Sequence, residues 1–382
     1  MGNTPNIRFK GFTDDWEQRK LGEFCNIVTG KLDANAMVEG GRYDFYTSGI
    51  QKYKIDTAAF EGPAITIAGN GATVGYMHLA DGLFNAYQRT YVLSDFSADR
   101  QYLYSEIGRE LPKKIAAEAR TGNIPYIVMN MLTDLEISVP IAEEQQKIGK
   151  YFGQLDFLIT LHQRKCDETK KLKKFMLQKM FPKKDEKKPE IRFADFTDDW
   201  EQRKLGDNII EYTEKTTINN QYPVLTSSRK GIFFQTEYYD GNQVASADNT
   251  GYNIVPYGYF TYRHMSDDEI FHFNINDIAE NGIVSTLYPV FTTDENLDSR
   301  YLQYQLNYGR EFAKYAILQK QGGSRTYMYL NKLKNLYLIV PKSVNEQKRI
   351  SGYFMQLDNL ITLHRRAYYN EKGELTNVHN DN

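Results

Sequence analysis

Few residues of this chain stand at the spacings that enzyme chemistry requires. Gly-Lys occurs only at Gly30-Lys31, and Cys25 occupies the position where a Walker A loop has its first glycine. The patterns His-Glu-x-x-His, Cys-x-x-Cys and Gly-x-Ser-x-Gly, which would indicate a zinc protease, a metal or redox site and a serine hydrolase, do not occur. The sequence therefore predicts a chain without catalytic residues and without a metal or cofactor of its own.

Two polar clusters could bind a ligand. The run Gly69-Asn70-Gly71-Ala72-Thr73-Val74-Gly75 could cradle a phosphate, but no helix signal follows it, so a turn between two strands is favoured. His264 and His272 lie near Asp267, Asp268 and Glu269. Because that spacing matches no familiar metal site, we expect exposed surface histidines there.

A third cluster approaches a known DNA-modifying motif. Asn123-Ile124-Pro125-Tyr126 is close to the Asn/Asp-Pro-Pro-Tyr/Phe motif with which DNA amino-methyltransferases hold an extruded base. The first proline is missing, no glycine-rich adenosylmethionine loop accompanies it, and the matching positions of the second half, Ser324 to Tyr327, depart further. We therefore expect Tyr126 and Tyr327 to be structural or binding residues, not catalytic ones.

The composition is that of an ordinary folded protein. The chain has 382 residues, enough for two domains, with 41% hydrophobic and 25% charged residues and only two cysteines. No apolar run approaches the ~20 residues of a membrane helix, the start has no apolar signal core, and Asn6 does not support a myristoyl site. We expect a soluble cytoplasmic protein. The net charge of −2 gives no overall sign of nucleic-acid binding.

The chain repeats itself. Residues 7–22 and 191–206 differ at only two of sixteen positions, and these copies hold both tryptophans, Trp16 and Trp200. Residues 139–164 and 340–366 form a second similar pair, whereas residues 24–121 and 208–322 share little. Together, the two pairs of similar segments form a repeated frame around each insert. Equal frames around different inserts suggest one kind of partner and two different targets.

Each half ends in a long amphipathic segment. Apolar residues recur every three or four positions, which predicts a central helix over 141–182 and a distal helix over 341–372. About 40 residues at 1.5 Å each would give a rod of ~60 Å, which favours pairing as an antiparallel coiled coil. The predicted seam consists of Ile148, Phe152, Leu155, Ile159 and His162 with Ile350, Phe354, Leu357, Ile361 and His364. We expect His162 and His364 to be packed, hydrogen-bonded residues of the helix pair, not metal ligands.

The remaining segments complete the predicted organisation. The lysine-rich stretch 164–188 could approach a phosphate backbone, but a solvated helix face is favoured, followed by a linker at 183–190. The inserts contain β-branched and aromatic runs separated by Gly, Asn and Pro, with helical patterns at 99–120 and 299–317. We therefore predict an α+β fold with globular domains at 1–140 and 191–340. The distal helix, which lacks the Met-Phe-Pro ending of the central one, should end between Tyr369 and Gly373, with a polar tail over 373–382.

These motifs resemble a known family. The Trp-Glu-Gln-Arg-Lys-Leu-Gly start of each half, the two Leu-Ile-Thr-Leu-His helices and the divergent inserts are similar to the specificity subunit of Type I restriction–modification systems. The resemblance covers nearly the whole chain. It implies two α+β target recognition domains, each reading half of an asymmetric, bipartite site in double-stranded DNA, and an antiparallel helix pair that separates them.

The same resemblance implies partners. The helix pair would dock two modification subunits, which methylate adenine N6 with S-adenosylmethionine. Restriction subunits that cleave DNA with ATP and Mg²⁺ would join them. The specificity subunit itself would be non-catalytic.

Residue type and loop context give candidate base readers. They are Lys31, Arg42, Asn70, Arg89 and Arg120 in the first domain, and Ser227, Arg229, Lys230, Arg263, Arg325 and Asn331 in the second. Arg and Lys pair with guanine edges and Asn with adenine, although a surface ion pair or turn is the simpler interpretation of each. Neither insert is basic, with 10 basic and 13 acidic residues in 24–140 and 11 and 14 in 208–340. Binding must therefore use local clusters and partner subunits that enclose the DNA.

Two other functions remain open. A stand-alone or anti-restriction DNA-binding adaptor would keep the frame without assembling an active enzyme, and the altered tail is its only support. A carbohydrate-binding protein with two β-rich modules would explain the 29 tyrosines but not the helical repeats.

Overall fold

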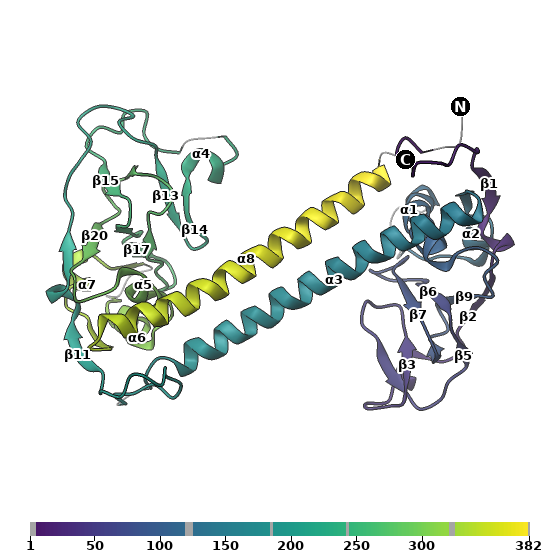
Figure 1. Cartoon of the computed structure of the whole chain (residues 1–382), viewed down its shortest axis with the longest axis horizontal. Helices are drawn as coiled ribbons and strands as arrows, with labels where there is room; N and C mark the ends of the chain where they lie inside the picture. Colours follow the sequence, from purple (N-terminus) through teal and green to yellow (C-terminus); the bar gives the residue numbers. More distant parts are fainter. Residues whose placement is uncertain (1–4, 119–124, 184–185, 242–243, 321–324, 381–382) are drawn as a thin grey trace. The chain divides into compact units, whose positions relative to one another are not determined.

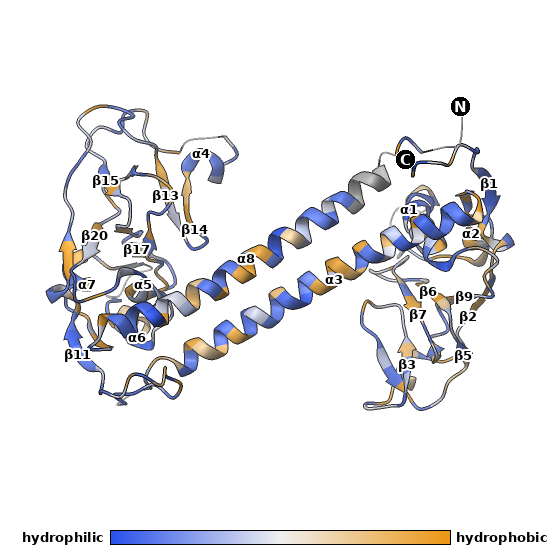
Figure 2. Ribbon diagram, in the orientation of Figure 1, coloured by the Kyte–Doolittle hydropathy of each residue, from blue (hydrophilic) through white to orange (hydrophobic). Residues whose placement is uncertain are grey.

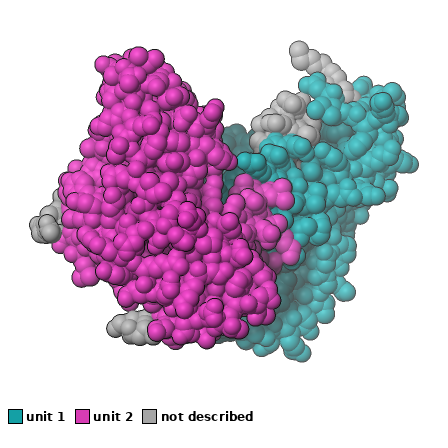
Figure 3. Space-filling view, turned by 60° about the vertical axis from the view of Figure 1, so that its left-hand side comes forward, with its two compact units in different colours: residues 1–164, 364–382 teal, residues 165–363 magenta. Residues whose placement is uncertain are grey.

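The chain folds into two compact units. The computed structural model describes residues 5–118, 125–183, 186–241, 244–320 and 325–380, with side chains up to Glu374. Unit 1 comprises residues 1–164 with 364–382, and unit 2 comprises residues 165–363 (Figure 3). Each unit therefore takes part of both long helices, and the division does not follow the predicted domain boundaries at 140 and 190.

Unit 1 contains two four-stranded sheets. One has the order β2-β9-β6-β7, with bounds Asn26–Thr29, Thr90–Ser94, Ala64–Ala68 and Met77–Ala80. The other has the order β4-β3-β8-β5, with bounds Tyr53–Ile55, Tyr43–Tyr46, Leu83–Ala86 and Phe60–Glu61 (Figure 1). Helices α1 (Arg100–Glu118) and α2 (Met129–Thr133) bury Leu103, Ile107 and Leu132 against the first sheet. The predicted turn at 69–75 is confirmed, since it connects the antiparallel strands β6 and β7.

Unit 2 also mixes strands and helices, but in a different arrangement. Its four-stranded sheet has the order β12-β20-β16-β18, with bounds Ile209–Glu211, Val290–Thr293, Phe260–Thr261 and Asn274–Ile275. Besides the frame pair described below for β11 and β22, the described insert contains three antiparallel pairs: β13 (Leu225–Ser228) with β14 (Gly231–Phe234), β15 (Asn253–Pro256) with β19 (Asn281–Val284), and β17 (Met265–Ser266) with β21 (Thr326–Tyr327). The helices are α4 (Gln235–Tyr238), α5 (Ser299–Tyr308), α6 (Arg310–Leu318) and α7 (Leu330–Leu333). The α+β class is confirmed, although the helix predicted over 299–317 is interrupted at Gly309.

The repeated frame has the same structure in both units. Strand β1 (Glu17–Lys20) pairs with β10 (Glu136–Val139), and β11 (Glu201–Lys204) pairs with β22 (Tyr337–Val340). The registers also match, because Glu17 lies opposite Val139 and Glu201 opposite Val340. Near-identical segments thus position each insert in the same way.

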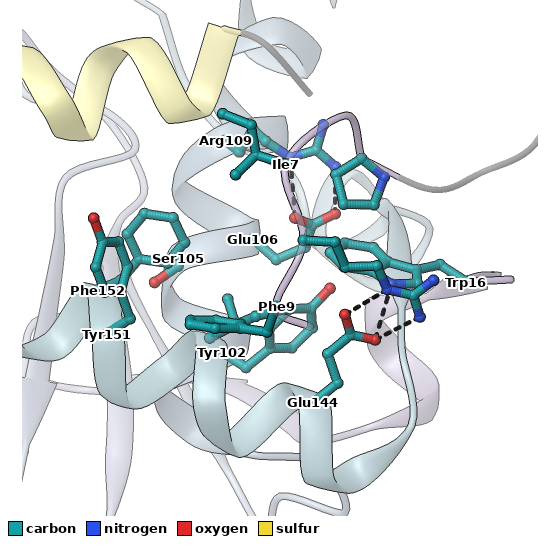
Figure 4. Close-up of a pocket in the computed structure, with 13 residues that line it drawn as sticks. Ile7, Phe9, Trp16, Tyr102, Ser105, Glu106, Arg109, Glu144, Tyr151 and Phe152 are labelled. Atoms are coloured by element: carbon teal, nitrogen blue, oxygen red, sulfur yellow. Dashed lines mark hydrogen bonds and ion pairs between the residues drawn. The ribbon is translucent and has the colours of Figure 1, made fainter. Parts of the chain in front are cut away.

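A buried ion pair joins each frame to its long helix. In unit 2 the guanidinium of Arg192 donates to both carboxylate oxygens of Glu346, at 2.6 and 2.8 Å, and the indole of Trp200 donates to the same carboxylate at 3.2 Å. In unit 1 Arg8 and Trp16 make the same contacts with Glu144, at 2.7, 2.7 and 3.2 Å (Figure 4). The Arg and Trp of each frame therefore attach the segment before the first frame strand to the start of the long helix.

The long helices α3 (Ala142–Lys179) and α8 (Val344–Asn380) are antiparallel where they meet. In unit 2 the thiol of Cys166 faces the carbonyl of Ile361 at 3.8 Å, and Lys173 further along α3 pairs with Asp358 earlier in α8 at 2.6 Å. In unit 1 the Nδ1 atoms of His162 and His364 are 3.1 Å apart. The prediction of packed, hydrogen-bonded histidines is confirmed.

The predicted seam residues divide between two roles. The early ones pack on the globular core of their own unit: Ile148, Ile350, Phe354 and Leu357. Phe152 and Leu155 are also buried, Ile159 is half-buried, and Ile361, His162 and His364 lie at the helix–helix contact. The N-terminal part of each helix thus packs on a globular core, and its C-terminal part contacts the other long helix. The spacing of apolar residues is the same in both parts, so it does not distinguish them.

The predicted early end of the distal helix is wrong, because α8 continues to Asn380. A single Gly373 costs a helix only about 1 kcal/mol, and the neighbouring Glu371, Lys372 and Glu374 are good helix formers. No proline follows Arg366 to stop the helix.

The described part of the predicted linker, 183 and 186–190, is attached to unit 2. The amide of Trp200 donates to the carbonyl of Lys187 at 2.9 Å, and Lys179 pairs with Glu190 at 2.6 Å. Lysines of the 164–188 stretch pair with nearby carboxylates, and Lys173 is buried, so the charge run is largely an ion-paired helix face. Among the described residues, none of the helices combines the length and the hydrophobicity of a membrane span.

Candidate nucleic-acid interface

Three candidate readers of unit 1 lie on loops at one end of a single sheet. Lys31 follows β2, Asn70 follows β6 and Arg89 precedes β9. Because β9 is antiparallel to both neighbours, with Thr29 opposite Tyr91 and Ala68 opposite Thr90, all three loops emerge at the same sheet end. Lys31 and Arg89 are exposed. The structure therefore brings together two cations and an amide.

The loop around Asn70 also holds an exposed tyrosine. Asn70 forms an antiparallel bridge with Tyr126, which is 56% exposed, and its side-chain oxygen accepts a hydrogen bond from Ser48 at 2.6 Å. Thr73 donates to the backbone carbonyl of Ser48. An aromatic face beside an amide and two cations offers stacking and base-edge contacts at one place.

The other unit 1 candidates are not part of this cluster. Arg42 lies at the start of β3, which runs parallel to β8, whereas Arg89 follows the end of β8. Four residues of extended chain place these ends roughly 13 Å apart. Arg42 donates to the carbonyl of Asp56 at 3.1 Å and covers the ring of Tyr43. Arg120 lies outside the described residues.

In unit 2, three consecutive acidic residues each hold a cation from a different element. Asp267 pairs with Arg325 at 2.8 Å, Asp268 pairs with Arg229, and Glu269 pairs with Lys320. The guanidinium of Arg229 holds the pKa of the Asp268 carboxyl well below its usual range. These cations are therefore neutralised locally, and any phosphate or base edge that bound them would have to displace their carboxylate partners.

A hollow of about 250 Å³ lies beside this row of ion pairs. Arg229, Arg263 and the half-buried His272 line it, and burial lowers the pKa of His272. Arg263 is exposed, as is Lys230 on the adjoining β13–β14 turn. Two predicted readers, Arg229 and Arg263, therefore line the same hollow, and Lys230 is next to Arg229 on the turn. Asn331 is exposed on the short helix α7.

Ser227 requires a correction. Its side chain is 7% exposed, donates to the carbonyl of Thr261 at 3.1 Å and accepts from Asn274 at 2.8 Å. The hydroxyl is used inside the fold, where it joins β13 to β16 and β18, so the structure favours a structural role for Ser227 over the predicted base contact.

Replacing Ser227 by alanine is expected to lower the free energy of unfolding by about 1–3 kcal/mol, because the Asn274 amide loses a buried acceptor. The DNA affinity of the folded protein should be unchanged, because the hydroxyl bonds to groups inside the fold. Urea unfolding and DNA titration of the same preparation measure both quantities. A loss of affinity without loss of stability would restore Ser227 as a reader.

Aromatic residues border the same face of unit 2. Tyr327 and Tyr329 are 37% and 48% exposed and their rings stack at 5.9 Å, with His264 stacked on Tyr329 at 5.0 Å. The expectation of two exposed histidines was wrong, because His264 is 6% exposed with its Nδ1 in contact with the carbonyl of Leu287, and His272 is half-buried. Among the described residues no cluster of His, Cys, Asp and Glu could hold a metal ion.

Sequence reasoning missed Lys320, Tyr329 and Ser48. Lys320 and Tyr329 are close in sequence to the predicted readers Arg325 and Asn331. Only their contacts with Glu269 and His264 place them beside the row of ion pairs in unit 2. A search for the charge partners of Asp267 to Glu269 would have found Lys320, but no local pattern identifies Ser48.

Comparison with known proteins matches this architecture. A sequence profile described as the Type I restriction modification DNA specificity domain matches residues 13–171 and again residues 197–371. The chain is 37% identical over 141 residues to the Type I restriction enzyme EcoDI specificity subunit of Escherichia coli, a match covering 37% of this chain but only 31% of that protein. It is 23% identical over 401 residues to the MjaVIII specificity subunit of Methanocaldococcus jannaschii, covering 92% and 88% of the two chains.

A solved structure shares the fold. The S subunit of the Type I restriction–modification system from M. genitalium superposes with a TM-score of 0.70 at 14% identity, covering 99% of this chain and 98% of that one. At this identity the likeness concerns the fold alone. Because the specificity-domain profile matches both halves of the repeat, the chain belongs to the family of Type I restriction–modification specificity subunits.

Proposed function

We propose that this chain is the DNA-recognition subunit of a Type I restriction–modification complex, and that each unit reads one half of an asymmetric, bipartite site. One observation carries the proposal: the repeated frame has the same register and the same Arg–Glu and Trp–Glu hydrogen bonds in both units, whereas the surfaces it presents differ. Unit 1 presents Lys31, Asn70 and Arg89 on sheet loops, and unit 2 presents ion-paired Arg229 and Arg325 beside Arg263. Different surfaces on equal supports suit two different half-sites.

The chemistry would belong to partner subunits. Modification subunits would methylate adenine N6 with S-adenosylmethionine, and restriction subunits would use ATP and Mg²⁺ to cleave DNA. This chain would contribute no catalytic group, and the complex would act in the cytoplasm on double-stranded DNA. The locally neutralised cations of unit 2 support a need for partners that enclose the DNA, because alone they offer phosphates little net charge.

Exposed apolar residues on the long helices mark where modification subunits would dock. Leu158 of α3 is 37% exposed and its repeat counterpart Leu360 of α8 is 44% exposed, with Phe157 at 66% and Leu363 at 60%. Hydrophobic residues stand between polar ones along both helices in Figure 2. Leu158 and Leu360 are exposed at repeat-related positions, which fits two copies of one partner, whereas Phe157 corresponds to Asn359 and Leu363 to the half-buried Leu161.

Leu158→Glu and Leu360→Glu are each expected to remove one bound modification subunit. A charge buried without a partner at the centre of an interface should weaken that contact about ten-fold or more. The masses of complexes formed by co-expressed subunits measure the stoichiometry. Gln154→Glu, at an exposed position on α3, adds the same charge as a control. Two bound subunits on the Leu158→Glu/Leu360→Glu double variant would exclude this docking face.

Enrichment from a random double-stranded DNA library tests the recognition function. The chain reconstituted with its modification subunits should select one motif with two specified parts separated by unspecified bases. Selection of no motif, or of one continuous motif, would contradict the proposal.

The adaptor alternative has lost its support, which was a shortened distal helix, because α8 has 37 residues against 38 in α3.

A further inference from the structure

Although the inserts share little sequence, one four-stranded sheet has the same strand order in both units. The first insert strand, β2 or β12, pairs with β9 or β20, which pairs in turn with β6 or β16, and the edge strand is β7 or β18. The remaining strands are grouped differently in the two units. Because these sheets are attached to equivalent frames, the loops at their ends can be compared between units.

Each insert also contains a hairpin at the same point of this shared topology. In unit 1, Phe45 of the β3–β4 hairpin pairs in parallel with Asn85 of β8, the strand before β9. In unit 2, Val224, directly before the β13–β14 hairpin, pairs in parallel with Ile283 of β19, the strand before β20. Phe45 and Val224 each stand two positions before a Thr-Ser pair. The two hairpins are therefore equivalent.

The β3–β4 hairpin is attached to the loop that holds the predicted reader Asn70. The hydroxyl of Ser48 donates to the side-chain oxygen of Asn70 at 2.6 Å, and Thr73 donates to the backbone carbonyl of Ser48. The Nε2 atom of His78 lies 3.4 Å from the carbonyl of Gly49. In unit 2 the equivalent serine donates to the carbonyl at the end of β16, the strand that corresponds to β6. The Thr-Ser pair thus holds each hairpin at the end of an equivalent strand.

The residues that follow the Thr-Ser pair differ in their chemistry. Unit 2 has the two-residue turn Arg229-Lys230 there. Ile50 and Gln51 stand at the same distance after the Thr-Ser pair of unit 1, on a longer connection between the two strands. Ile50 is 57% exposed, and Gln51 is also exposed. The hairpin tip of unit 1 therefore presents an apolar side chain and an amide where that of unit 2 presents two cations.

The next residue, Lys52, is held by its own hairpin. Its Nζ atom lies 3.5 Å from the carboxylate of Asp44 and 5.7 Å from the centre of the Tyr46 ring. The side-chain amide of Gln51, in contrast, makes no hydrogen bond to any residue that the structure describes. Within the described part of the chain, Gln51 keeps both its donor and its acceptor for a ligand.

An amide and an apolar side chain at a hairpin tip suit an A·T base pair. The major groove of B-DNA admits a two-stranded β-ribbon. A glutamine there can donate to N7 of adenine and accept from its N6 amino group, and an apolar side chain can contact the methyl group of thymine. Arginine, which unit 2 has at its tip, pairs with guanine instead.

We propose that the tip of the β3–β4 hairpin reads an A·T base pair in the half-site of unit 1, with Gln51 on the adenine edge and Ile50 on the thymine methyl group. This inference rests on the proposed function, in which each unit reads one half of a bipartite site. It adds the residues that read one position and the kind of base pair that they select.

Enrichment from a random double-stranded DNA library by the chain assembled with its modification subunits tests this inference. Gln51→Ala should lower the preference for A·T at one position of one half about ten-fold, because a two-point contact to one base supports discrimination of that order. Gln51→Arg should replace this preference by one for G·C at the same position, and Ile50→Ser should weaken the preference at that base pair. Gln154→Ala, at an exposed glutamine on α3 of unit 1, is the matched control and should leave both halves unchanged.

The outcomes separate this inference from the proposed function. A bipartite motif that stays the same with Gln51→Ala and Gln51→Arg would overturn the inference alone, as would a loss of preference at a G·C pair or in both halves. No motif, or a continuous one, from the unaltered chain would overturn the proposed function and this inference with it. A gained G·C preference in Gln51→Arg requires a folded unit 1, so unfolding cannot produce the expected result.

Discussion

The double variant Arg229→Ala/Arg263→Ala is expected to bind its specific DNA about 100-fold more weakly or worse. Each arginine that pairs with two acceptors of a guanine edge contributes about 1–3 kcal/mol of discrimination, so two give roughly 2–6 kcal/mol. Both residues line the same hollow of unit 2. Loss of Arg229 also leaves the Asp268 carboxylate without its guanidinium, and that free negative charge repels the DNA backbone.

Titration of the partner-assembled chain with specific and random DNA at several salt concentrations measures this loss. Specific binding should fall strongly and random binding only slightly, with a shallower salt slope only if these arginines contact phosphates. Arg310→Ala, an exposed arginine on α6 of the same unit, is the matched control and should change little. Unchanged specific affinity in the double variant would remove the hollow from the interface.

Replacing Glu346 by alanine is expected to destabilise unit 2 by about 3–5 kcal/mol, the usual cost of removing one partner of a buried ion pair. The Glu346 side chain is 2% exposed and accepts from both Arg192 and the Trp200 indole. Without it, a guanidinium that is 12% exposed and a buried N–H lose their acceptor. Glu346→Gln keeps an oxygen acceptor and should cost less.

The repeat provides an internal control. Glu144→Ala breaks the equivalent contacts of unit 1, where Arg8 keeps a hydrogen bond to the carbonyl of Asp14 at 2.6 Å and the Trp16 indole is only half-buried. The loss should therefore be smaller than in unit 2. Chemical denaturation followed separately by Trp16 and Trp200 fluorescence, using the two Trp→Phe variants, assigns each transition to its unit. A loss below 1 kcal/mol for Glu346→Ala would show that the pair does not anchor the frame.

Much of the fold could be predicted because the informative residues act locally or are repeated. The turn at Gly69 to Gly75 depends on nearby glycines, and two of these, Gly71 and Gly75, have positive φ angles of 88° and 82°. The long helices follow from apolar spacing, and a near-identical frame sequence imposes the same strand register twice. The turn and the helices depend on nearby residues, whereas the frame strands pair with segments more than 100 residues away and were recognised only because the sequence repeats them.

The errors concern residues whose environment is set by distant segments. Ser227 and His264 are polar residues in strand-rich segments, yet Asn274 and Tyr329, each more than 40 residues away, pack against them and help to bury them. The ion pairs of Arg229 and Arg325 depend on the position of the 265–269 segment, which no periodicity specifies. The contact between the rings of Phe181 and Trp200 likewise depends on the chain folding back after the end of α3, which no local pattern predicts.

The bipartite reading of DNA is the central claim, and methylated adenines in genomic DNA report it most directly. Single-molecule sequencing should be carried out on cells that express the modification subunits with no specificity chain, with this chain, or with the Arg229→Ala/Arg263→Ala variant. We predict one methylated motif made of two specified halves that appears only with the intact chain and is lost or relaxed in one half with the variant. Identical methylation in all three cultures, or a motif in which the variant alters both halves equally, would contradict two separately reading units.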